Sequence, residues 1–292
     1  MIVVFGSINL DLIFDLPELP APGQTVLGPA MRMEPGGKGA NQAAAAALDA
    51  APVVLAGAVG RDALAEPALA GLRRAGVDLS RVAAVETATG CASICVDPQG
   101  RNHIAVGSDA NLFARAAQIE DALLGPGTTV LLQMEVPPAE TAALIRRARA
   151  GGARIVLNLA PAAALDPAAL RQVDLLVVNE EESAWLARHL ATTPDAAALR
   201  ATLGVDVVRT LGAAGLSAAT ASGTLNIPAH DVNAIDTTAA GDCFTGVLAA
   251  ALGRGAPLDA ALRRANRAAA LCCTRPGTQA SLPSSADIDA AT

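Results

Sequence analysis

The chain has 292 residues, of which 52% are hydrophobic and 17% charged, so it is long enough to bury a full-sized core and is globular rather than disordered. A formal net charge of −7 and an aromatic content of 2% argue against a nucleic-acid partner, which requires a basic face or platforms for stacking bases. Five cysteines without a C-x-x-C pair argue against a disulfide framework or a zinc site and favour a reducing compartment.

The N-terminal segment lacks the features of a signal peptide. No basic region, extended apolar stretch or cleavage site precedes Asp11. The longest apolar passage, residues 43–59, is interrupted by Asp49 and Pro52, which argues against a membrane span. We therefore expect a cytoplasmic protein with no membrane partner.

Short β-branched runs alternate with helical stretches along most of the chain. Six apolar runs have the length of buried parallel strands: Ile2–Phe5, Val53–Ala56, Val130–Leu132, Ile155–Leu157, Leu175–Val178 and Val205–Val208. Stretches of helical length and spacing lie between them: Leu64–Ala75, Ala139–Ala150 and Glu180–Leu190. The alternation predicts an α/β fold, a doubly wound and mostly parallel sheet flanked by helices, as a single domain of residues 1–292.

Two regions depart from this alternation. Residues 11–34 are rich in Pro and Gly, and residues 90–106 have the pattern of a hairpin that turns at Asp97-Pro98-Gln99-Gly100. We expect these two segments to form a small β-lid beside the main sheet. A second hairpin is predicted near Ala218–Ile227, and two helices follow, at about Gly241–Leu252 and Leu258–Cys273.

The segment Asp-Thr-Thr-Ala-Ala-Gly-Asp at 236–242 is the most informative stretch. It follows a strand-like segment, Val232–Ile235, and opens a helix. The small residues at 239–241 let a ligand approach the backbone, and the first N–H groups of the helix point outward at the positive end of its dipole. We therefore expect an anion site, with Asp242 placed to take a proton from an attacking hydroxyl. The alternative is that Asp236 or Thr238 simply caps the helix.

A glycine-rich turn at 35–42, Pro-Gly-Gly-Lys-Gly-Ala-Asn-Gln, also leads into a helix. It is neither a Walker A loop nor G-x-G-x-x-G, because the required spacing, the Ser/Thr after Lys38 and the third Gly are missing. Lys38 and Asn41 suit a neutral polyol that is held by many hydrogen bonds. A helix entry without a chemical role is the alternative interpretation.

Polar residues also follow other predicted strands, where open parallel sheets bind their ligands. Asn9 and Asp11 follow the first strand, and Glu135 follows Val130–Leu132; turn formation or a solvated acid would explain them equally well. Asn179–Glu182 and Thr210–Gly215 are candidates for a nucleotide site. Acids near phosphates act through a metal, normally Mg²⁺ and its waters, although helix capping gives the same pattern.

Taken together, these residues resemble the ribokinase family of carbohydrate kinases over nearly the whole chain. The resemblance rests on the segments at 35–42 and 236–242, on Gly-Ser-Ile-Asn-Leu-Asp at 6–11, Asn179 and Glu182, Thr-Leu-Gly at 210–212, and the segment 274–281. It implies ATP-dependent transfer of a phosphoryl group to the primary hydroxyl of ribose or a close relative. The implied sugar-binding residues are Asn9, Asp11, Gly37, Lys38, Asn41, Glu135 and Asp242.

The resemblance also implies roles for the remaining candidates. Asp242 would be the catalytic base, and backbone groups of Ala239, Ala240 and Gly241 would form an anion hole. The implied ATP site consists of Asn179, Thr210, Gly212, Gly215, Gly241 and Asn266, with Glu182 organising Mg²⁺ through water. A K⁺ activator would be held by Asp236, Thr238, Cys272, Arg275, Gly277 and Ser281, mostly through carbonyl groups. A homodimer formed through the lid is a further implication.

The identity of the acceptor stays open at this point. Deoxyribose, a nucleoside, fructose or a keto-sugar acid are alternatives, because the segment 61–66 and Val247 depart from the family pattern. A non-catalytic sugar sensor would keep the sugar residues and lose the base, so Asp242 argues against it. A dinucleotide-dependent dehydrogenase is disfavoured by the missing G-x-G-x-x-G.

Overall fold

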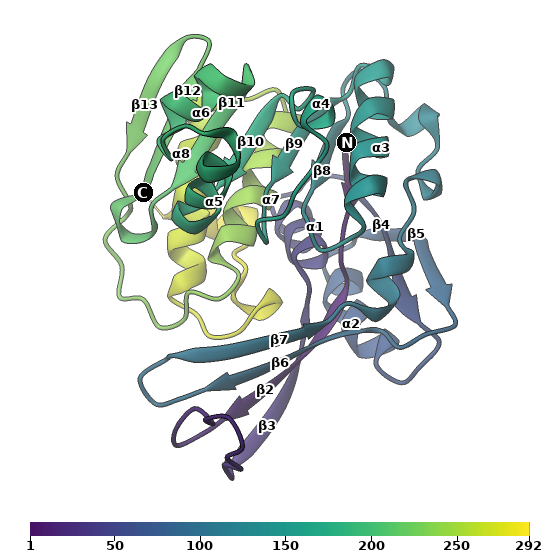
Figure 1. Cartoon of the computed structure of the whole chain (residues 1–292), viewed down its shortest axis with the longest axis vertical. Helices are drawn as coiled ribbons and strands as arrows, with labels where there is room; N and C mark the ends of the chain where they lie inside the picture. The colour runs from purple at the N-terminus through teal and green to yellow at the C-terminus, as the bar shows by residue number, and fades with distance from the viewer. Residues whose placement is uncertain (292) are drawn as a thin grey trace.

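The computed structural model describes residues 1–291 and contains two sheets of different character (Figure 1). The main sheet has nine strands in the order β13-β12-β11-β10-β9-β8-β1-β4-β5. Its strands are β1 (Ile2–Phe5), β4 (Val53–Gly60), β5 (Asp78–Val85), β8 (Thr129–Leu132), β9 (Arg154–Asn158), β10 (Leu175–Val178), β11 (Asp206–Thr210), β12 (Leu216–Thr220) and β13 (Gly223–Ile227). Neighbouring strands are parallel from β11 through β5, and the hairpin β12–β13 adds two antiparallel strands at one edge.

Helices cover both faces of the main sheet because its strands are apolar on both faces. In β1, Ile2 and Val4 belong to one core cluster and Val3 and Phe5 to the other, as the twofold alternation of strand side chains requires. The first cluster packs against α1 (Lys38–Leu48), α2 (Ala65–Arg74), α7 (Ala240–Gly253), α8 (Leu258–Cys273) and α9 (Ser285–Ala290). The second packs against α3 (Pro138–Gly151), α4 (Pro167–Leu170), α5 (Glu180–Leu190) and α6 (Ala196–Leu203).

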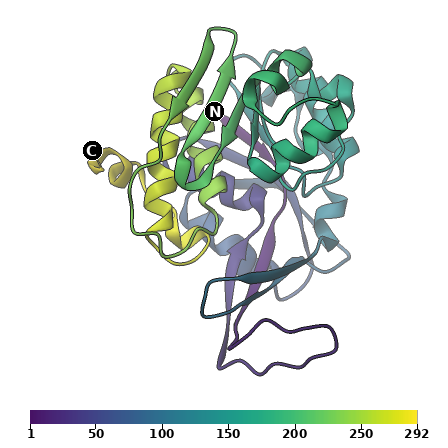
Figure 2. The same ribbon diagram turned by 60° about the vertical axis from the view of Figure 1, so that its left-hand side comes forward.

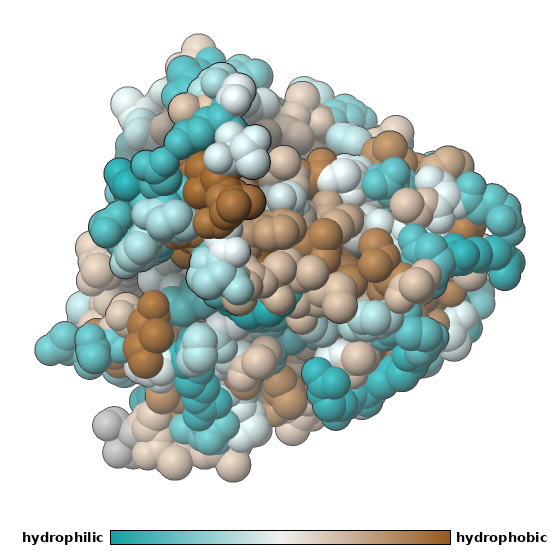
Figure 3. Space-filling model, turned by 90° about the horizontal axis from the view of Figure 1, so that it is seen from below, coloured by the Kyte–Doolittle hydropathy of each residue, from teal (hydrophilic) through white to brown (hydrophobic). Residues whose placement is uncertain are grey.

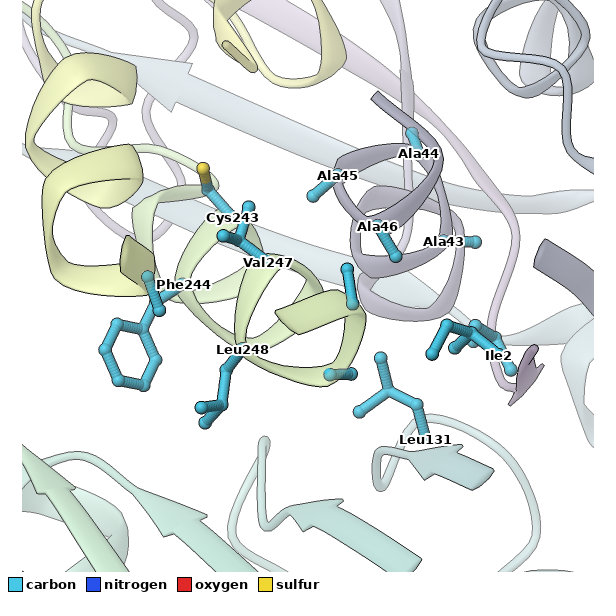
Figure 4. Packing of buried hydrophobic residues seen from close by; sticks show 14 of the residues in the cluster. Ile2, Ala43, Ala44, Ala45, Ala46, Leu131, Cys243, Phe244, Val247 and Leu248 are labelled. Atoms are coloured by element: carbon cyan, nitrogen blue, oxygen red, sulfur yellow. The ribbon is translucent and has the colours of Figure 1, made fainter. Parts of the chain in front are cut away.

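Helices α1 and α7 pack unusually close together because small side chains line their contact (Figure 4). A Cβ atom on Gly246 would lie 2.4 Å from the carbonyl oxygen of Gln42 and 2.7 Å from the Cβ of Ala45. Only a glycine at position 246 permits this approach without a shift of one helix. As a result, side chains in the first turns of α1 and α7 meet.

The small sheet projects from one end of the main body (Figures 1 and 2). It has four strands in the order β3-β2-β6-β7: β2 (Asn9–Asp15), β3 (Ala30–Gly36), β6 (Gly90–Val96) and β7 (Asn102–Gly107). Exposed apolar side chains lie on two of its strands, Met31 and Met33 on β3 and Ile104 and Val106 on β7. Seen from this end, the surface carries apolar patches among hydrophilic residues (Figure 3).

The predicted strands and helices of the main sheet agree with the structure to within a few residues. One expectation was wrong: Val232–Ile235 is not a strand. This segment crosses the carboxyl end of the sheet, and Val232 and Ala234 line a cavity instead of packing in a core. No helix within residues 1–291 is long and apolar enough to cross a membrane.

Candidate functional site

A cavity of about 240 Å³, here called the polar cavity, lies at the carboxyl ends of three parallel strands. Asn158 ends β9, Asn179 follows β10 and Thr210 ends β11, so the ligand location expected for an open parallel sheet is the one observed. Its lining residues are Lys38, Asn158, Ala160, Val177, Asn179, Glu182, Thr210, Thr237, Ala239, Gly241, Asp242 and Thr245.

Helix α7 begins at this cavity without a side-chain cap from the described residues. Its N-cap residue, Ala239, has a left-handed backbone with φ 60°, so neither Asp236 nor Thr238 caps the helix. Among residues 1–291, the amide groups of Gly241 and Asp242 have no hydrogen-bond acceptor, whereas the Ala240 amide donates to the Thr237 carbonyl at 3.3 Å. The open amides and the helix dipole make this end of α7 attractive to an anion.

The carboxylate of Asp242 lies beside these amides and is held by two side-chain amides from α1. Asn41 Nδ2 donates to Asp242 Oδ2 at 3.1 Å, and Gln42 Nε2 donates to Asp242 Oδ1 at 2.9 Å. Asp242 is only 7% exposed, yet it lines the polar cavity. The carboxylate is therefore fixed in direction and still reachable by a ligand, as a general base requires.

Three further amide side chains, Asn158, Gln133 and Gln279, extend this hydrogen-bonded network, and neither they nor Gln42 were predicted as site residues. Gln42 Nε2 also donates to Asn158 Oδ1 at 3.0 Å and Gln42 Oε1 accepts from Gln133 Nε2 at 2.7 Å. Gln279 Nε2 donates to Asn41 Oδ1 at 3.2 Å. Gln42 and Asn158 carried a signal, because one lies in the glycine-rich segment and the other ends a predicted strand. Gln133 carried the same signal, because it directly follows the predicted strand Val130–Leu132, and Gln279 lies in the segment 274–281, but neither was singled out.

Lys38, in the first turn of α1, lies among four acids. Burial lowers the pKa of its ammonium, but Asp242, Glu135, Glu182 and Asp11 outweigh that effect and the pKa is raised. The lysine therefore carries a stable positive charge next to the open end of α7, where it complements a phosphate.

The predicted sugar residues surround the junction of the two sheets. Asn9 Oδ1 accepts from Asn111 Nδ2 at 2.7 Å, and Glu135 Oε2 accepts from Ser7 Oγ at 2.6 Å and from the Lys38 amide at 3.0 Å. Asn111 and Ser7 are therefore additional polar contacts. Ser7 lies in the segment 6–11 on which the resemblance rests, whereas no pattern singled out Asn111.

Asp11 on β2 is a carboxyl group in a strongly acidic surrounding. Burial together with the nearby acids Glu135, Glu34 and Asp242 raises its pKa from 3.8 to about 7. The turn from β3 into α1 is tight. Its central residue, Gly37, is the N-cap of α1 and has φ 88°, a conformation that favours glycine.

A second cavity of about 430 Å³, here called the apolar cavity, adjoins the first. Both cavities share Thr210, Thr237 and Gly241. Five of the predicted nucleotide residues line the apolar cavity: Thr210, Gly212, Gly215, Gly241 and Asn266. The sixth, Asn179, lines the polar cavity. Mostly small or apolar residues complete the apolar cavity, among them Ala213, Val232, Phe244 and Ala270.

Asn179 and Glu182 form a reciprocal capping box at the start of α5. The Asn179 side chain accepts from the Glu182 amide, and Glu182 Oε2 accepts from the Asn179 amide, both at 2.8 Å. Burial raises the pKa of Glu182, which lines the polar cavity. Capping thus explains this pair, and the second oxygen of Glu182 is not engaged in the box.

The predicted cation residues lie together beside the start of α7. Asp236 Oδ2 accepts from the Gly277 amide at 3.0 Å, and Cys272 Sγ lies 3.0 Å from Ser281 Oγ and 3.9 Å from the Thr238 carbonyl. The side chain of Arg275 instead points to Asp287, at 3.4 Å.

The chain matches the family model described as "pfkB family carbohydrate kinase" over residues 1–285. It is 33% identical to a ribokinase of Haemophilus influenzae, covering 97% of this chain and 95% of the relative. It is 34% identical to a deoxyribokinase of Salmonella typhi, with 97% and 95% covered. The structure of Arabidopsis thaliana ribokinase complexed with ribose and ATP superimposes with a TM-score of 0.89 at 28% identity, over 98% of this chain and 96% of that chain. The chain belongs to the pfkB family of carbohydrate kinases and is a phosphotransferase that acts on a sugar.

Proposed function

We propose that this protein phosphorylates ribose on its primary hydroxyl, converting ribose and ATP to ribose 5-phosphate and ADP. The observation that carries the proposal is the placement of the Asp242 carboxylate beside the open amides of α7, where the polar and apolar cavities join. The likeness to a ribokinase with ribose and ATP in its structure supports this substrate pair.

Asp242 is the proposed catalytic base. Its carboxylate accepts the proton of the sugar's terminal hydroxyl as the oxygen attacks the γ-phosphorus, and the bond from that phosphorus to the ADP oxygen breaks. The amides of Ala239, Ala240 and Gly241 form the proposed anion hole for the charge on the transferred group. The Ala240 amide must leave the long 3.3 Å contact to Thr237 to take part.

The nucleotide is proposed to lie in the apolar cavity with its phosphates reaching toward Gly241. Thr210, Gly212, Gly215 and Asn266 line this cavity, and the residues shared with the polar cavity give a continuous path to Asn179 and the start of α7. Burial of a flat apolar base among alanines with a few polar groups at its edge is the usual chemistry of such pockets.

Glu182 is the residue proposed to hold Mg²⁺ through water. Its carboxylate faces the polar cavity, and carboxylate oxygens and water are the ligands that Mg²⁺ prefers. When bound, the ion would neutralise charge on the phosphate oxygens.

The K⁺ site is proposed at Asp236, Thr238, Cys272, Arg275, Gly277 and Ser281. Backbone carbonyls and one carboxylate fit a weakly hydrated monovalent cation, which takes oxygen ligands in place of its hydration shell. In this arrangement the Cys272 thiol need not be a ligand, because its sulfur lies against the hydroxyl of Ser281.

The sugar is proposed to lie under the small sheet, which then acts as a lid. Asn9, Asp11, Gly37, Lys38, Asn41 and Glu135 converge there, and closure would exclude water from the reaction. Deoxyribose is the alternative acceptor, favoured by the likeness to a deoxyribokinase, and a nucleoside or another small sugar is a weaker one.

We also propose that the protein is a cytoplasmic homodimer formed through the lid. The exposed apolar side chains of β3, Met31 and Met33, lie on the face of the small sheet opposite to Asp11 and fit a self-complementary contact. Met33→Glu would then yield a monomer in analytical ultracentrifugation while the wild-type chain sediments as a dimer. An unchanged sedimentation coefficient would remove this part of the proposal.

The test of the catalytic role is Asp242→Asn. We expect kcat for ribose to fall on the order of 10²-fold or more with the affinity for ATP kept, because the amide fills the same space but accepts no proton. Asp259→Asn is the matched control, since Asp259 is an exposed acid in the first turn of the neighbouring helix α8. Near-normal turnover of the Asp242 variant would refute the assignment. A panel of ribose, deoxyribose and nucleosides, compared by kcat/KM, decides the acceptor.

A further inference from the structure

The loop Gly277–Gln279 touches three parts of the molecule that the proposed reaction must bring together. One contact reaches β3 of the small sheet, one reaches the segment before α7, and one leads to Asp242. Among Glu34, Asp236 and Asn41, only Glu34 belongs to the small sheet, so its contact depends on the relative placement of the two sheets, whereas the contacts with Asp236 and Asn41 lie within the main body. A shift of the small sheet would therefore move the loop and, through it, the segment before α7 and Asn41.

The contact with the small sheet is made by Glu34, which has an exposed side-chain fraction of 19%. Glu34 Oε2 accepts from the Thr278 amide at 2.9 Å and from Thr278 Oγ1 at 3.4 Å, and Thr278 Oγ1 donates to the Pro35 carbonyl at 2.6 Å. The other oxygen of Glu34 accepts from Arg32 Nε at 2.9 Å. Hydrogen bonds to a half-buried carboxylate are stronger than neutral ones, so β3 and the loop are firmly joined.

The contact with the start of α7 runs through Asp236. Its Oδ2 accepts from the Gly277 amide at 3.0 Å, and its Oδ1 accepts from the Thr238 amide at 2.9 Å. Thr238 directly precedes Ala239, the residue whose left-handed backbone turns the open amides toward the polar cavity. The position of Gly277 thus bears on the direction of the anion-binding amides.

The contact with the base runs through two amide side chains whose orientation the carboxylate fixes. Asn41 must present its Nδ2 to Asp242, so its Oδ1 faces Gln279, and Gln279 must donate its Nε2. In the described part of the chain Gln279 Oε1 is buried without a partner, which costs about 1–3 kcal/mol.

We propose that Glu34 is a positioning residue that couples the small sheet to the anion-binding end of α7 and to Asp242 through the loop Gly277–Gln279. Sugar bound under the small sheet and nucleotide bound at α7 would then strengthen each other's binding, since both favour one placement of the loop. This inference rests on the proposed function, because it takes the sugar and nucleotide sites as assigned above.

The experiment measures the coupling factor, which is the Kd of a non-hydrolysable ATP analogue without ribose divided by its Kd with saturating ribose. We expect a factor of about 5 or more for the wild-type chain, by isothermal titration calorimetry. In Glu34→Gln the factor should fall toward 1, because the amide forms weaker hydrogen bonds to Thr278. A general loss of stability would change both Kd values and leave their ratio unaltered.

Asp15→Asn is the matched control. Asp15 lies on the neighbouring strand β2 and binds the same Arg32, at 2.8 Å, but it does not touch the loop. Its coupling factor should equal that of the wild-type chain. Gln279→Met, of similar volume, should lower the factor as Glu34→Gln does and leave every contact of the small sheet in place. It carries the test alone if the Glu34 variant does not fold.

The proposal is overturned if the wild-type factor is 1, if Glu34→Gln keeps the wild-type factor, or if Asp15→Asn lowers it equally. Failure of the proposed function is a separate result. If the proposed function is wrong, the wild-type chain phosphorylates no pentose. If the wild-type chain is active and Glu34→Gln keeps the wild-type coupling factor, only the coupling proposal is wrong.

Discussion

The two sheets of this protein differ in how their strands are stabilised. Strands of the main sheet such as β1, β4 and β8 are buried along their whole length, between helices on both faces. In the small sheet, by contrast, every residue of β7 is exposed and β3 is exposed along its first four residues. The main sheet therefore draws its stability from packing, and the small sheet from strand pairing and from its few contacts with the main body.

This difference divides the site into a fixed and an adjustable part. The base and the open amides belong to α7, which is buried against α1 and α8. The small sheet contributes Asp11 and Glu34, whose neighbours are other polar groups rather than a core. Chemistry placed on the packed part stays aligned while the other part moves to admit the sugar.

The largest effect on the fixed part is expected from Asp49→Ala. This carboxylate ends α1 and has an exposed side-chain fraction of 0%. It accepts from Arg254 Nη2 at 2.6 Å and Arg264 Nε at 2.9 Å, joining α1 to the end of α7 and to α8. Removing it leaves two arginines without their buried partner, so the free energy of unfolding should fall by about 3–5 kcal/mol.

Urea denaturation at pH 7 measures this change. Asp259→Ala is the control, because the exposed pair of Asp259 and Arg263 is worth about 0–1 kcal/mol. Equal losses in the two variants would contradict the idea that the helical layer is held by its buried carboxylate.

A smaller effect is expected from Gly246→Ala, which tests the close contact of α1 and α7. The added methyl group would overlap the Gln42 carbonyl and push the helices apart, at a cost of about 1–3 kcal/mol. The hydrogen bonds from Asn41 and Gln42 to Asp242 would then lengthen or break, so kcat should fall while the KM for ATP changes little.

Thermal unfolding and steady-state kinetics check both parts. Gly125→Ala is the control, since a Cβ at Gly125 would meet no atom within 4 Å. A stable, fully active Gly246 variant would mean that the first turns of α1 and α7 do not depend on this contact.

The same contrast between packed and exposed elements explains how much of the fold the sequence predicts. The strands of the main sheet are continuous apolar runs, and β1 and β10 begin and end where predicted. Strands β2 and β3 lie largely within residues 11–34, which were predicted only as part of a lid. The first four residues of β3 are exposed, and an exposed strand lacks an apolar run. β5 carries charged and small residues and was not predicted.

The site shows a similar division. Asp242 and Lys38 could be placed because each lies where a helix is expected to begin, and Thr210 because it follows a predicted strand. Gln133 and Gln279 could not, because their roles depend on pairs of residues brought together by tertiary packing. A single glutamine in a loop gives no periodicity or spacing from which such a role can be read.

The smallest effect concerns the adjustable part and the carboxyl group of Asp11. Its pKa is raised to about 7 in the folded chain from 3.8, so the folded state holds an additional proton between about pH 4 and about pH 7. The contribution of Asp11 to stability is therefore lost as the pH rises through that window. If the ionised carboxylate is the form that accepts hydrogen bonds from sugar hydroxyls, the affinity for ribose rises as the pH rises through the same window.

From about pH 6 to about pH 8 the ionised fraction of a group with this pKa rises roughly tenfold, so the KM for ribose should fall roughly tenfold. Asp11→Asn has no proton to lose, and its KM should be higher and independent of pH over this range. Initial rates at three pH values for both chains measure the difference. If the KM of the Asp11→Asn variant depends on pH as it does in the wild-type chain, the titrating group is not Asp11. The small sheet would then contribute no ionisable contact to the sugar.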